Sequence, residues 1–264
     1  MRIQVAFVPQ LLPDPAARGV CVVIDILRAT TTLTTLLEYG AAQVLVAPQA
    51  SAARALKAAD PAALLLGEIG GLRPPDFDHG NSPHELAPAR VRGRRAICHT
   101  TNGTAAIRAA IAAPLTLLGC LRNATAVIAH GYVAAVQQGV PLTIVCSGGS
   151  GGRAFALDDT LVAGAFVALA AALAAALDAA AGASPDLDEA ADAALTLHRV
   201  AFGGASRPDA ARWAVALAET SAGRHLAGLG LGADIPFCAQ VDATRAVPVA
   251  ALEGDAVVLR LPVG

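Results

Sequence analysis

"CVVIDILRATTTLTTLLEYG" (residues 21–40) sets the pattern of the whole chain: an apolar run, then charged and hydroxyl residues, then a predicted helix. The apolar run consists mostly of residues that favour buried strands, and it ends at Asp25. Arg28 and five threonines among residues 30–35 follow it. Threonine is a mediocre helix former because its branched Cβ loses χ1 freedom, so helix stability alone does not explain these residues.

The same alternation of strand and helix recurs along the chain. Strands are predicted at residues 3–8, 20–25, 43–47, 63–68, 95–100, 115–119, 142–147 and 257–261. Helices are predicted near residues 30–39, 50–59, 103–112, 123–138, 157–181, 188–202 and 209–229. Several strands are continuously apolar, as expected where helices cover both faces of a sheet. We therefore predict an α/β fold with three layers, α/β/α, around a largely parallel or mixed central sheet.

The organisation between these elements is less regular. We treat residues 1–264 as one α/β unit, with a division into lobes 1–120 and 121–264 around a cleft as a further expectation. Residues 179–190 are the best linker candidate, because Gly182 and Pro185 mark a change in composition. The segment 70–90 is longer than ordinary connections and rich in Pro, Gly and charge, which indicates a functional loop or lid.

Composition excludes several classes of protein. With 55% hydrophobic and 15% charged residues the chain is not disordered, and a net charge of −2 gives no basis for binding nucleic acid. Its five cysteines are scattered without CxxC spacing, which favours a reducing cytoplasm. Residues 161–177 carry no charge, but nine are alanine and both flanks are acidic, so we predict a buried helix rather than a membrane span. Its small residues also leave room for a homodimer.

Polar residues follow the ends of three predicted strands, where ligands bind in open α/β sheets. After the first, Asp25 and Arg28 precede Thr30, Thr31 and Thr32 at a helix start, a natural phosphate site. The second, "HTTNGTAAIRAA" (99–110), presents Thr101, Asn102, Gly103 and Thr104; the third, "VCSGGSGGRAFALDD" (145–159), combines glycines with Arg153, Asp158 and Asp159. Taken singly, each is equally well read as ordinary capping or turn chemistry.

A fourth group consists of oxygen donors. Glu68 ends a strand, and Asp76, Asp78, Asn81 and Glu85 follow in a stretch too polar for a core. Hard cations such as Mg²⁺ take ligands of this kind. Together with Asp25 and either Asp158 or Asp159, Glu68 predicts a magnesium site beside arginines that hold phosphoryl oxygens, and hence metal-assisted hydrolysis of a small phosphorylated anion.

These motifs together resemble one family. "VVIDILRATTT", "GLRPPDFDHGNSP", "TTNGT", "CSGGSGGRAFALDDTLVAG" and "GADIPFCAQVD" are similar, in order, to the motifs of the 2-phosphosulfolactate phosphatases. The resemblance implies a cytoplasmic, Mg²⁺-dependent α/β enzyme that hydrolyses 2-phosphosulfolactate to 3-sulfolactate and phosphate, on the route to coenzyme M. By position it places in the site Asp25, Arg28, Thr30, Thr31, Thr32, Glu68, Asp78, Asn81, Ser82, Asn102, Thr104 and Asp159.

Our assignment of roles follows from these residues. Asp25, Arg28, Asn102 and Asp159 are predicted to be catalytic, and Asp25, Glu68 and Asp159 to bind metal. Substrate contacts are predicted for Arg28, Thr30, Thr31, Thr32, Asn81, Ser82, Thr101, Asn102, Gly103, Thr104 and Arg153. The chain departs from the family at Ile69, where an arginine is usual, and at Asp76, where a glycine is usual. Arg73 or Arg153 could offset the lost charge; otherwise the substrate differs or activity is reduced.

Three mechanistic alternatives remain at this stage. Either a metal-bound water attacks the phosphoryl group, which we favour, or Asp25 attacks and forms an aspartyl phosphate. Cys146 and Arg153 have C-x₆-R spacing, one residue longer than in cysteine phosphatases, so Cys146 is predicted to be a buried strand-end residue. The protein could also hydrolyse a different small phosphorylated acid, or bind an anion or nucleotide without catalysis.

Overall fold

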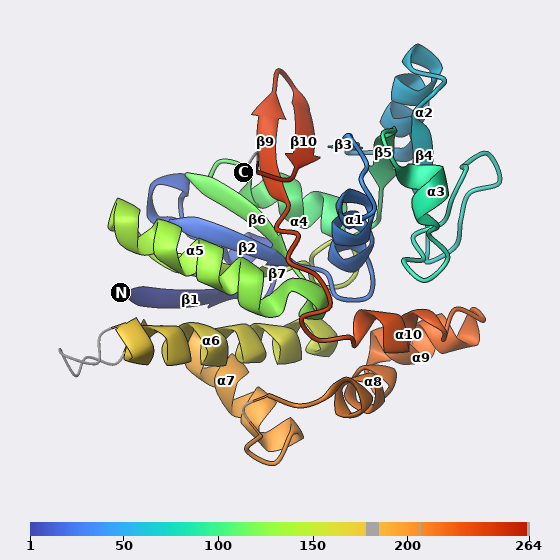
Figure 1. The fold of residues 1–264 in the computed structure, drawn as a ribbon. Helices are drawn as coiled ribbons and strands as arrows, with labels where there is room; N and C mark the ends of the chain where they lie inside the picture. Colours follow the sequence, from blue (N-terminus) through green and yellow to red (C-terminus); the bar gives the residue numbers. More distant parts are fainter. Residues whose placement is uncertain (178–184, 206, 263–264) are drawn as a thin grey trace.

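The computed structural model describes residues 1–177, 185–205 and 207–262 (Figure 1). Within these residues one sheet has the strand order β4-β5-β3-β10-β9-β6-β2-β7-β1-β8. Its strands are β1 (Arg2–Ala6), β2 (Val20–Ile24), β3 (Gln43–Val46), β4 (Leu64–Gly67), β5 (Arg95–His99), β6 (Leu115–Gly119), β7 (Leu142–Cys146), β8 (Asp186–Leu187), β9 (Val249–Glu253) and β10 (Ala256–Arg260). All eight predicted strands are present, and the mixed, largely parallel sheet confirms the predicted fold class.

Helices cover this sheet on both faces. They are α1 (Ala29–Glu38), α2 (Ala50–Ala59), α3 (Pro88–Val91), α4 (Gly103–Ala110), α5 (Ala124–Gln138), α6 (Leu157–Leu177), α7 (Glu189–Ala201), α8 (Ala210–Ala218), α9 (Ser221–Gly228) and α10 (Asp234–Cys238), with short 3₁₀ turns at Pro9–Leu11, Pro15–Ala17 and Leu121–Asn123. Alternate residues of β2 enter different cores: Val20, Val22 and Ile24 pack with α5 and α6, whereas Cys21 and Val23 pack with α1 and α4. This is why the strand is apolar throughout.

The C-terminal hairpin β9–β10 joins two parallel sets of strands. β9 pairs antiparallel with β6, and β10 pairs antiparallel with β3, so the set β4-β5-β3 formally opposes the set β6-β2-β7-β1. Five strand-to-strand steps separate β2 from β5, and a twist of about 20–25° per step turns the two sets through roughly 110°. Figure 1 accordingly shows β3–β5 standing steeply to β2 and β7. The carboxyl ends of both sets therefore meet in one region.

Two predicted boundaries are corrected by the structure. The helix predicted at 209–229 is two helices, because the Thr220 hydroxyl accepts from the Gly223 N–H and starts α9 afresh. Of the predicted linker 179–190, residues 179–184 lie outside the described residues, as do 178–181 of the predicted helix 157–181. The rest of the linker is ordered structure: β8 pairs with β1, and Asp188 caps α7 through the Ala191 N–H. The division into two lobes stays a prediction.

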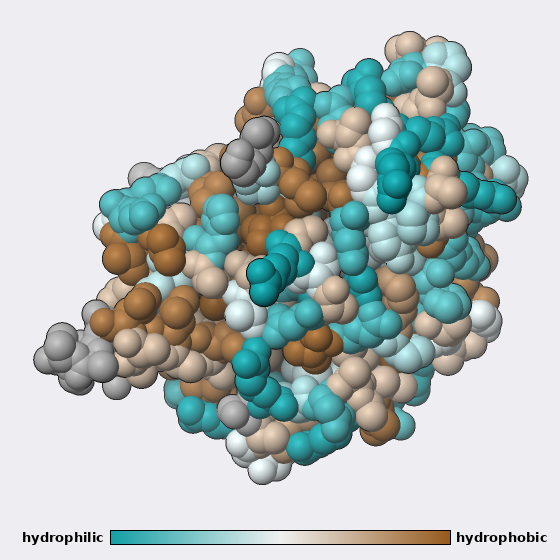
Figure 2. Space-filling model, in the orientation of Figure 1, coloured by the Kyte–Doolittle hydropathy of each residue, from teal (hydrophilic) through white to brown (hydrophobic). Residues whose placement is uncertain are grey.

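Among the described residues, one helix is long and apolar enough to cross a membrane, and this helix is α6. Over half of its most apolar window is buried, and it packs between α5, α7 and the sheet as a core helix. Gly164 makes the closest approach: a Cβ there would lie 2.2 Å from the Ala194 carbonyl oxygen of α7. Of the small residues that suggested a homodimer, Ala163, Gly164, Ala165, Ala170 and Ala174 are buried within the chain, and the dimer is not supported. The apolar area at the left of Figure 2 lies over the ends of α5 and α6.

Candidate active site

A cavity of about 700 Å³ lies where the two sets of strands meet. Residues after β2, β4, β5 and β7 form one side of it, and the α8–α9 segment forms another. Its polar and charged lining consists of Asp25, Arg28, Glu68, Asn81, Thr101, Asn102, Ser150, Asp158, Glu219, Thr220, Ser221, Arg224 and His225. The predicted convergence of Asp25, Arg28, Glu68 and Asn102 is therefore seen in the structure.

Asp25 sits at the floor of the cavity, directly after β2. Its Oδ1 accepts the N–H of Ala29 at 3.0 Å, so the carboxylate caps α1. Its Oδ2 lies next to Gly103: a Cβ built on that glycine would be 2.8 Å from it. Burial raises the pKa of the Asp25 carboxyl to about 6, and the nearby charge of Glu68 adds to the rise. The Asp25 carboxyl is thus held in a fixed position, and little positive charge lies near it to balance its own.

Asp158 and Asp159 begin α6 but play different parts. Asp158 lines the cavity, and burial raises the pKa of its carboxyl to about 6, with the charge of Asp25 contributing. Asp159 is 2% exposed and does not line the cavity. Its Oδ1 accepts the Ile26 N–H at 3.0 Å, and its Oδ2 accepts from the Ser147 hydroxyl and the Gly148 N–H at 2.9 and 3.1 Å. Asp159 therefore fastens the β2 and β7 ends together, and Asp158 is the acid that faces the cavity.

Glu68 joins the second set of strands to the site. Its Oε1 accepts the Thr101 N–H at 2.6 Å. Its Oε2 accepts the Gly71 N–H at 2.6 Å and the Thr101 hydroxyl at 3.1 Å. The carboxylate therefore holds the loops after β4 and β5 in place as well as lining the cavity.

Arg28 is held by a buried ion pair that reaches across the fold. Its Nη1 donates to Asp234 Oδ2 at 2.7 Å, with both side chains 3% exposed or less, and its Nη2 donates to the Gly71 carbonyl at 2.8 Å. The other oxygen of Asp234 accepts from the Ser82 hydroxyl at 2.5 Å. Ser82 is thus a support for this pair, and it does not line the cavity. Since a guanidinium has five N–H groups, Arg28 keeps donors for a ligand.

The threonines of α1 lie beneath the cavity rather than in its wall. Thr30, Thr31 and Thr32 are fully buried, and none lines the cavity. Their hydroxyls donate to backbone carbonyl oxygens of Asp25, Ile26 and Arg28 respectively, and Thr32 Oγ1 also contacts the Asn81 carbonyl oxygen. The direct phosphate contacts predicted for them find no support in this arrangement. The hydroxyls instead satisfy the carbonyls of the turn that carries Asp25 and Arg28.

Some residues of the "TTNGT" turn after β5 line the cavity, and others hold the turn and its helix in place. Thr101 and Asn102 line the cavity, and Asn102 Oδ1 accepts the Gly151 N–H at 2.8 Å. Thr104 is buried, and its hydroxyl caps the turn through the Thr100 N–H. Gly103 allows α4 to approach α1: a Cβ there would lie 2.4 Å from the Ala29 Cβ. Asn102 therefore links the α4 start to the glycine loop, and Gly103 serves packing.

The glycine loop after β7 contributes backbone more than charge. Gly149 and Ser150 line the cavity, and Ser150 has a positive φ of 53°. Arg153 is exposed and is not part of the wall. Cys146 is fully buried at the end of β7, and burial raises the pKa of its thiol well above the ordinary value. The structure therefore confirms Cys146 as a buried strand-end residue.

The 70–90 segment lines the cavity through Gly70, Gly71 and Asn81. Asn81 is buried, and its Oδ1 has no hydrogen-bond partner among the described residues. Asp78 accepts the Leu65 N–H and pairs with Lys57, whereas Asp76 pairs with Arg54 on the surface. Neither aspartate is a cavity residue, and neither is Arg73, which donates to the Phe77 carbonyl.

Sequence reasoning missed most of the helical wall. Glu219, Ser221, Arg224 and His225 line the cavity from the α8–α9 segment, sixty or more residues beyond Asp159 in the sequence. Asp234, which lies within the motif "GADIPFCAQVD", is the ion-pair partner of Arg28. Thr220 offered a cue of its own, since threonine is a preferred residue at a helix N-cap.

The fold and this acidic, strand-end cavity define an α/β enzyme of the kind that handles small charged ligands. The sequence profile of the 2-phosphosulpholactate phosphatase family matches residues 6–252. The chain is similar to a Deinococcus radiodurans protein named probable 2-phosphosulfolactate phosphatase, with 40% identity over 94% of this chain and 92% of the relative. Similar proteins of the same printed name occur in Thermus thermophilus (38% identity; 94% of each chain) and Thermosynechococcus vestitus (34% identity; 94% and 96%). The chain belongs to the 2-phosphosulfolactate phosphatase family, and it is accordingly a phosphoric monoester hydrolase.

Proposed function

We propose that this protein hydrolyses 2-phosphosulfolactate to 3-sulfolactate and inorganic phosphate, with Mg²⁺ as its cofactor. The observation that carries the proposal is the meeting of Asp25, Asp158 and Glu68 with Arg28 in one cavity. The family match supports the choice of reaction, and the printed names of the relatives support the choice of substrate. Enzyme family membership also favours hydrolysis over the non-catalytic anion binder.

The donor set suits magnesium in one particular form. Among the described residues no three His, Cys, Asp or Glu side chains lie close enough to hold a metal by themselves. Mg²⁺ commonly binds through one or two carboxylates, keeps waters and takes the remaining ligands from a substrate phosphate. Asp25 and Asp158 fit that pattern, because both are buried carboxylates facing the cavity with little positive charge nearby. We assign the ion to this pair rather than to Asp159; bound there, it would neutralise phosphoryl oxygens.

Each of the remaining residues has a mechanical part in the proposal. Arg28 presents its unused N–H groups to the phosphoryl oxygens, and Asp234 holds its orientation. Gly149 and Ser150 form a backbone wall that a ligand can approach closely. Asp25, fixed by the Ala29 N–H, either orients an attacking water or attacks phosphorus itself; we favour water. Glu68 and Asn102 keep the surrounding loops in register.

The decisive experiment is phosphate release from 2-phosphosulfolactate by the purified protein, with Mg²⁺ and after exhaustive chelation. Turnover that chelation abolishes and Mg²⁺ restores is the expected result. Absence of turnover with any small phosphomonoester would favour the alternative of a non-catalytic anion-binding protein. Turnover unaffected by chelation would contradict the proposed dependence on Mg²⁺. In a single turnover in H₂¹⁸O, label entering the Asp25 carboxyl would eliminate direct attack by water, because it requires hydrolysis of an aspartyl phosphate at its carbonyl carbon. A cytoplasmic location and a role in coenzyme M biosynthesis stay predictions.

A further inference from the structure

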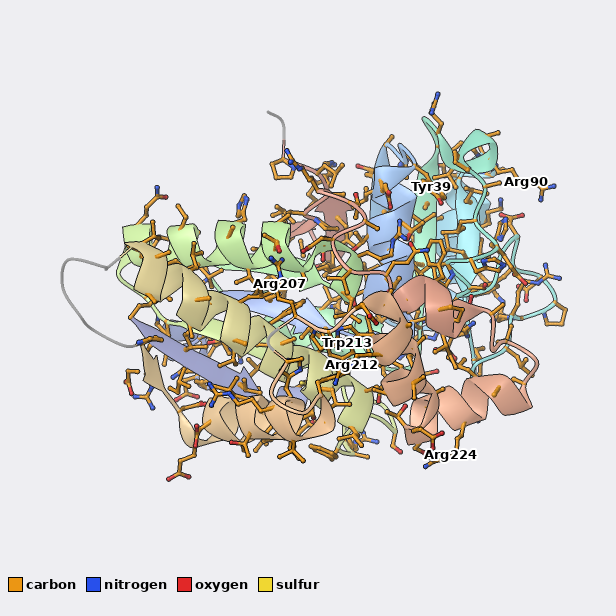
Figure 3. The ribbon with its side chains drawn as sticks, turned by 60° about the horizontal axis from the view of Figure 1, so that its bottom comes forward. Tyr39, Arg90, Arg207, Arg212, Trp213 and Arg224 are labelled. Carbon is orange, nitrogen blue, oxygen red and sulfur yellow. The ribbon has the colours of Figure 1, made fainter. Side chains whose placement is uncertain are left out.

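The helical wall gives the cavity a cationic end. Arg224 and His225 lie on α9, and with Arg28 they are the basic side chains among the described residues that line the cavity. Arg224 is 65% exposed, so its guanidinium is open to a ligand that enters from solvent. Figure 3 shows Arg224 at the edge of the C-terminal helices, beside the end of α6, and α6 and α9 are in contact.

The three basic side chains differ in how closely an acidic group is paired with them. Arg28 is paired at 2.7 Å with Asp234 in a site closed to solvent, so most of its charge is already matched. Among the described residues, the one carboxylate in an ion pair with Arg224 is that of Glu219, which is exposed and lies 4.0 Å away; Arg224 also donates to the Glu219 carbonyl. An exposed pair at that distance is weak. No acidic side chain is paired with His225 among the ion pairs of the described residues. The α9 end therefore has the positive charge that is most available to a ligand.

This cationic end is close to the proposed phosphoryl site. Gly71 accepts from Arg28 through its carbonyl, and a Cβ built on Gly71 would lie 3.2 Å from His225 Nε2. One glycine thus separates the Arg28 environment from α9. The first N–H groups of α9, at Ser221 and Ala222, belong to residues that line the same cavity, and a helix start favours an anion. Phe155 and Leu157 line the cavity as well and supply an apolar surface.

We propose that Arg224, assisted by His225, binds the second acidic group of the substrate, the sulfonate or carboxylate that does not react. The inference rests on the proposed function and deepens it, since it assigns substrate selection to α9 and phosphoryl transfer to the sheet side. A phosphomonoester with a second anionic group is held at both ends of the cavity. A phosphomonoester without one is held at the phosphoryl end alone.

Binding measurements test this without any turnover. Sulfolactate has a sulfonate and a carboxylate but no phosphoryl group, so its titration by ligand-observed NMR probes the α9 end of the cavity. Inorganic phosphate has neither of these groups, so its titration probes the phosphoryl end. Arg224→Gln is expected to weaken sulfolactate binding about tenfold and to leave phosphate binding within twofold, as loss of one charge-assisted contact predicts. Arg224→Lys should recover part of the loss. Arg199→Gln, an exposed arginine on α7 away from the cavity, is the matched control.

A second variant, which is expected to strengthen sulfolactate binding, distinguishes the proposed contact from a merely structural effect. Glu219→Gln removes the carboxylate that competes for Arg224, so sulfolactate should bind about twofold to threefold more tightly. In kinetics, Arg224→Gln should raise KM for 2-phosphosulfolactate with kcat nearly unchanged, and leave phenyl phosphate unaffected. Equal weakening of sulfolactate and phosphate, or no change for either, overturns the inference. Failure of the proposed function appears separately, as absence of turnover in the unmodified protein.

Discussion

The sheet side of the cavity and its helical wall are built in different ways. On the sheet side, Asp25, Glu68 and Asn102 each follow a strand by one to three residues, so the strand end itself carries them to the cavity. Asp158 reaches the same cavity at the start of α6, after the glycine loop that follows β7. On the helical wall, Arg224 and Asp234 reach the site only through the packing of short helices. The proposed phosphoryl end of the cavity therefore depends on the sheet, whereas the proposed second anion site on α9 depends on tertiary contacts between helices. Five experiments test this distinction.

The largest effect is expected on the sheet side. Asp25→Asn keeps an oxygen for the Ala29 N–H but removes the carboxylate, so kcat should fall about a thousandfold with the fold intact. Steady-state phosphate release measures the loss, and circular dichroism checks the fold. Asp192→Asn, an exposed acid on α7, is the control. An Asp25→Asn enzyme with a tenth of wild-type activity or more would show that this carboxylate is dispensable.

The second largest effect is expected at the Arg28–Asp234 ion pair, which connects the sheet side to the helical wall. Asp234→Ala leaves the Arg28 guanidinium buried without its partner, which is expected to lower the free energy of unfolding by about 3 kcal/mol. Urea denaturation measures the change, and kcat/KM should fall with it because Arg28 loses its position. Removing both partners, with Arg28→Met and Asp234→Leu, should restore stability but not activity. Equal recovery of both would mean that Arg28 serves the fold alone.

The packing of α4 against α1 next to Asp25 depends on Gly103. Gly103→Ala places a methyl group 2.4 Å from the Ala29 Cβ and 2.8 Å from Asp25 Oδ2. We expect about 2 kcal/mol lower stability, since overpacked sites lose that much, together with reduced kcat from a displaced Asp25. Gly228→Ala, in a helical position of α9 with open space around it, should be neutral or slightly stabilising. Thermal unfolding of both variants makes the comparison.

The helical region should respond to acid through His198. Burial beside Phe202 and Trp213 lowers the pKa of His198, so the unfolded chain binds its proton more readily than the native protein. Stability from this group is therefore complete above the ordinary pKa of 6.5 and is lost as the pH falls through it toward the native value. His198→Phe should flatten that part of the profile of unfolding free energy against pH. An unchanged slope between pH 7 and pH 5 would contradict this.

The smallest effect is expected at the rim. Ile69 is 54% exposed beside Glu68, at the position where the resemblance led us to expect an arginine. Ile69→Arg should lower KM for 2-phosphosulfolactate about twofold to threefold at low salt and lose this gain at high salt, because exposed charges are weak and screened. Ile69→Gln controls for the lost apolar side chain. A gain that persists at high ionic strength would point to direct contact instead.

The pattern of successes and errors in prediction has a physical basis. Short, continuously apolar runs such as residues 20–24 favour strands buried on both faces, and runs of this length between turn residues made eight strands predictable. β9 was missed because the short run 249–253 is mostly exposed, and Leu252 is 53% exposed. Neighbouring residues at a helix start point about 100° apart, so "DD" alone does not say that Asp158 rather than Asp159 faces the cavity. Nor does a cluster of hydroxyls reveal that Thr30, Thr31 and Thr32 bond their own backbone.

By itself, the sequence determined the alternation of strands and helices, the acids placed at strand ends and the family to which they belong. These features depend on local hydrophobic patterning and on residue types at fixed distances along the chain. Tertiary structure alone decided which of two adjacent acids faces the ligand, that a buried aspartate 206 residues away holds Arg28, and that α9 supplies the cationic wall. Those outcomes depend on sheet twist and helix packing, which bring together residues that no short-range pattern connects.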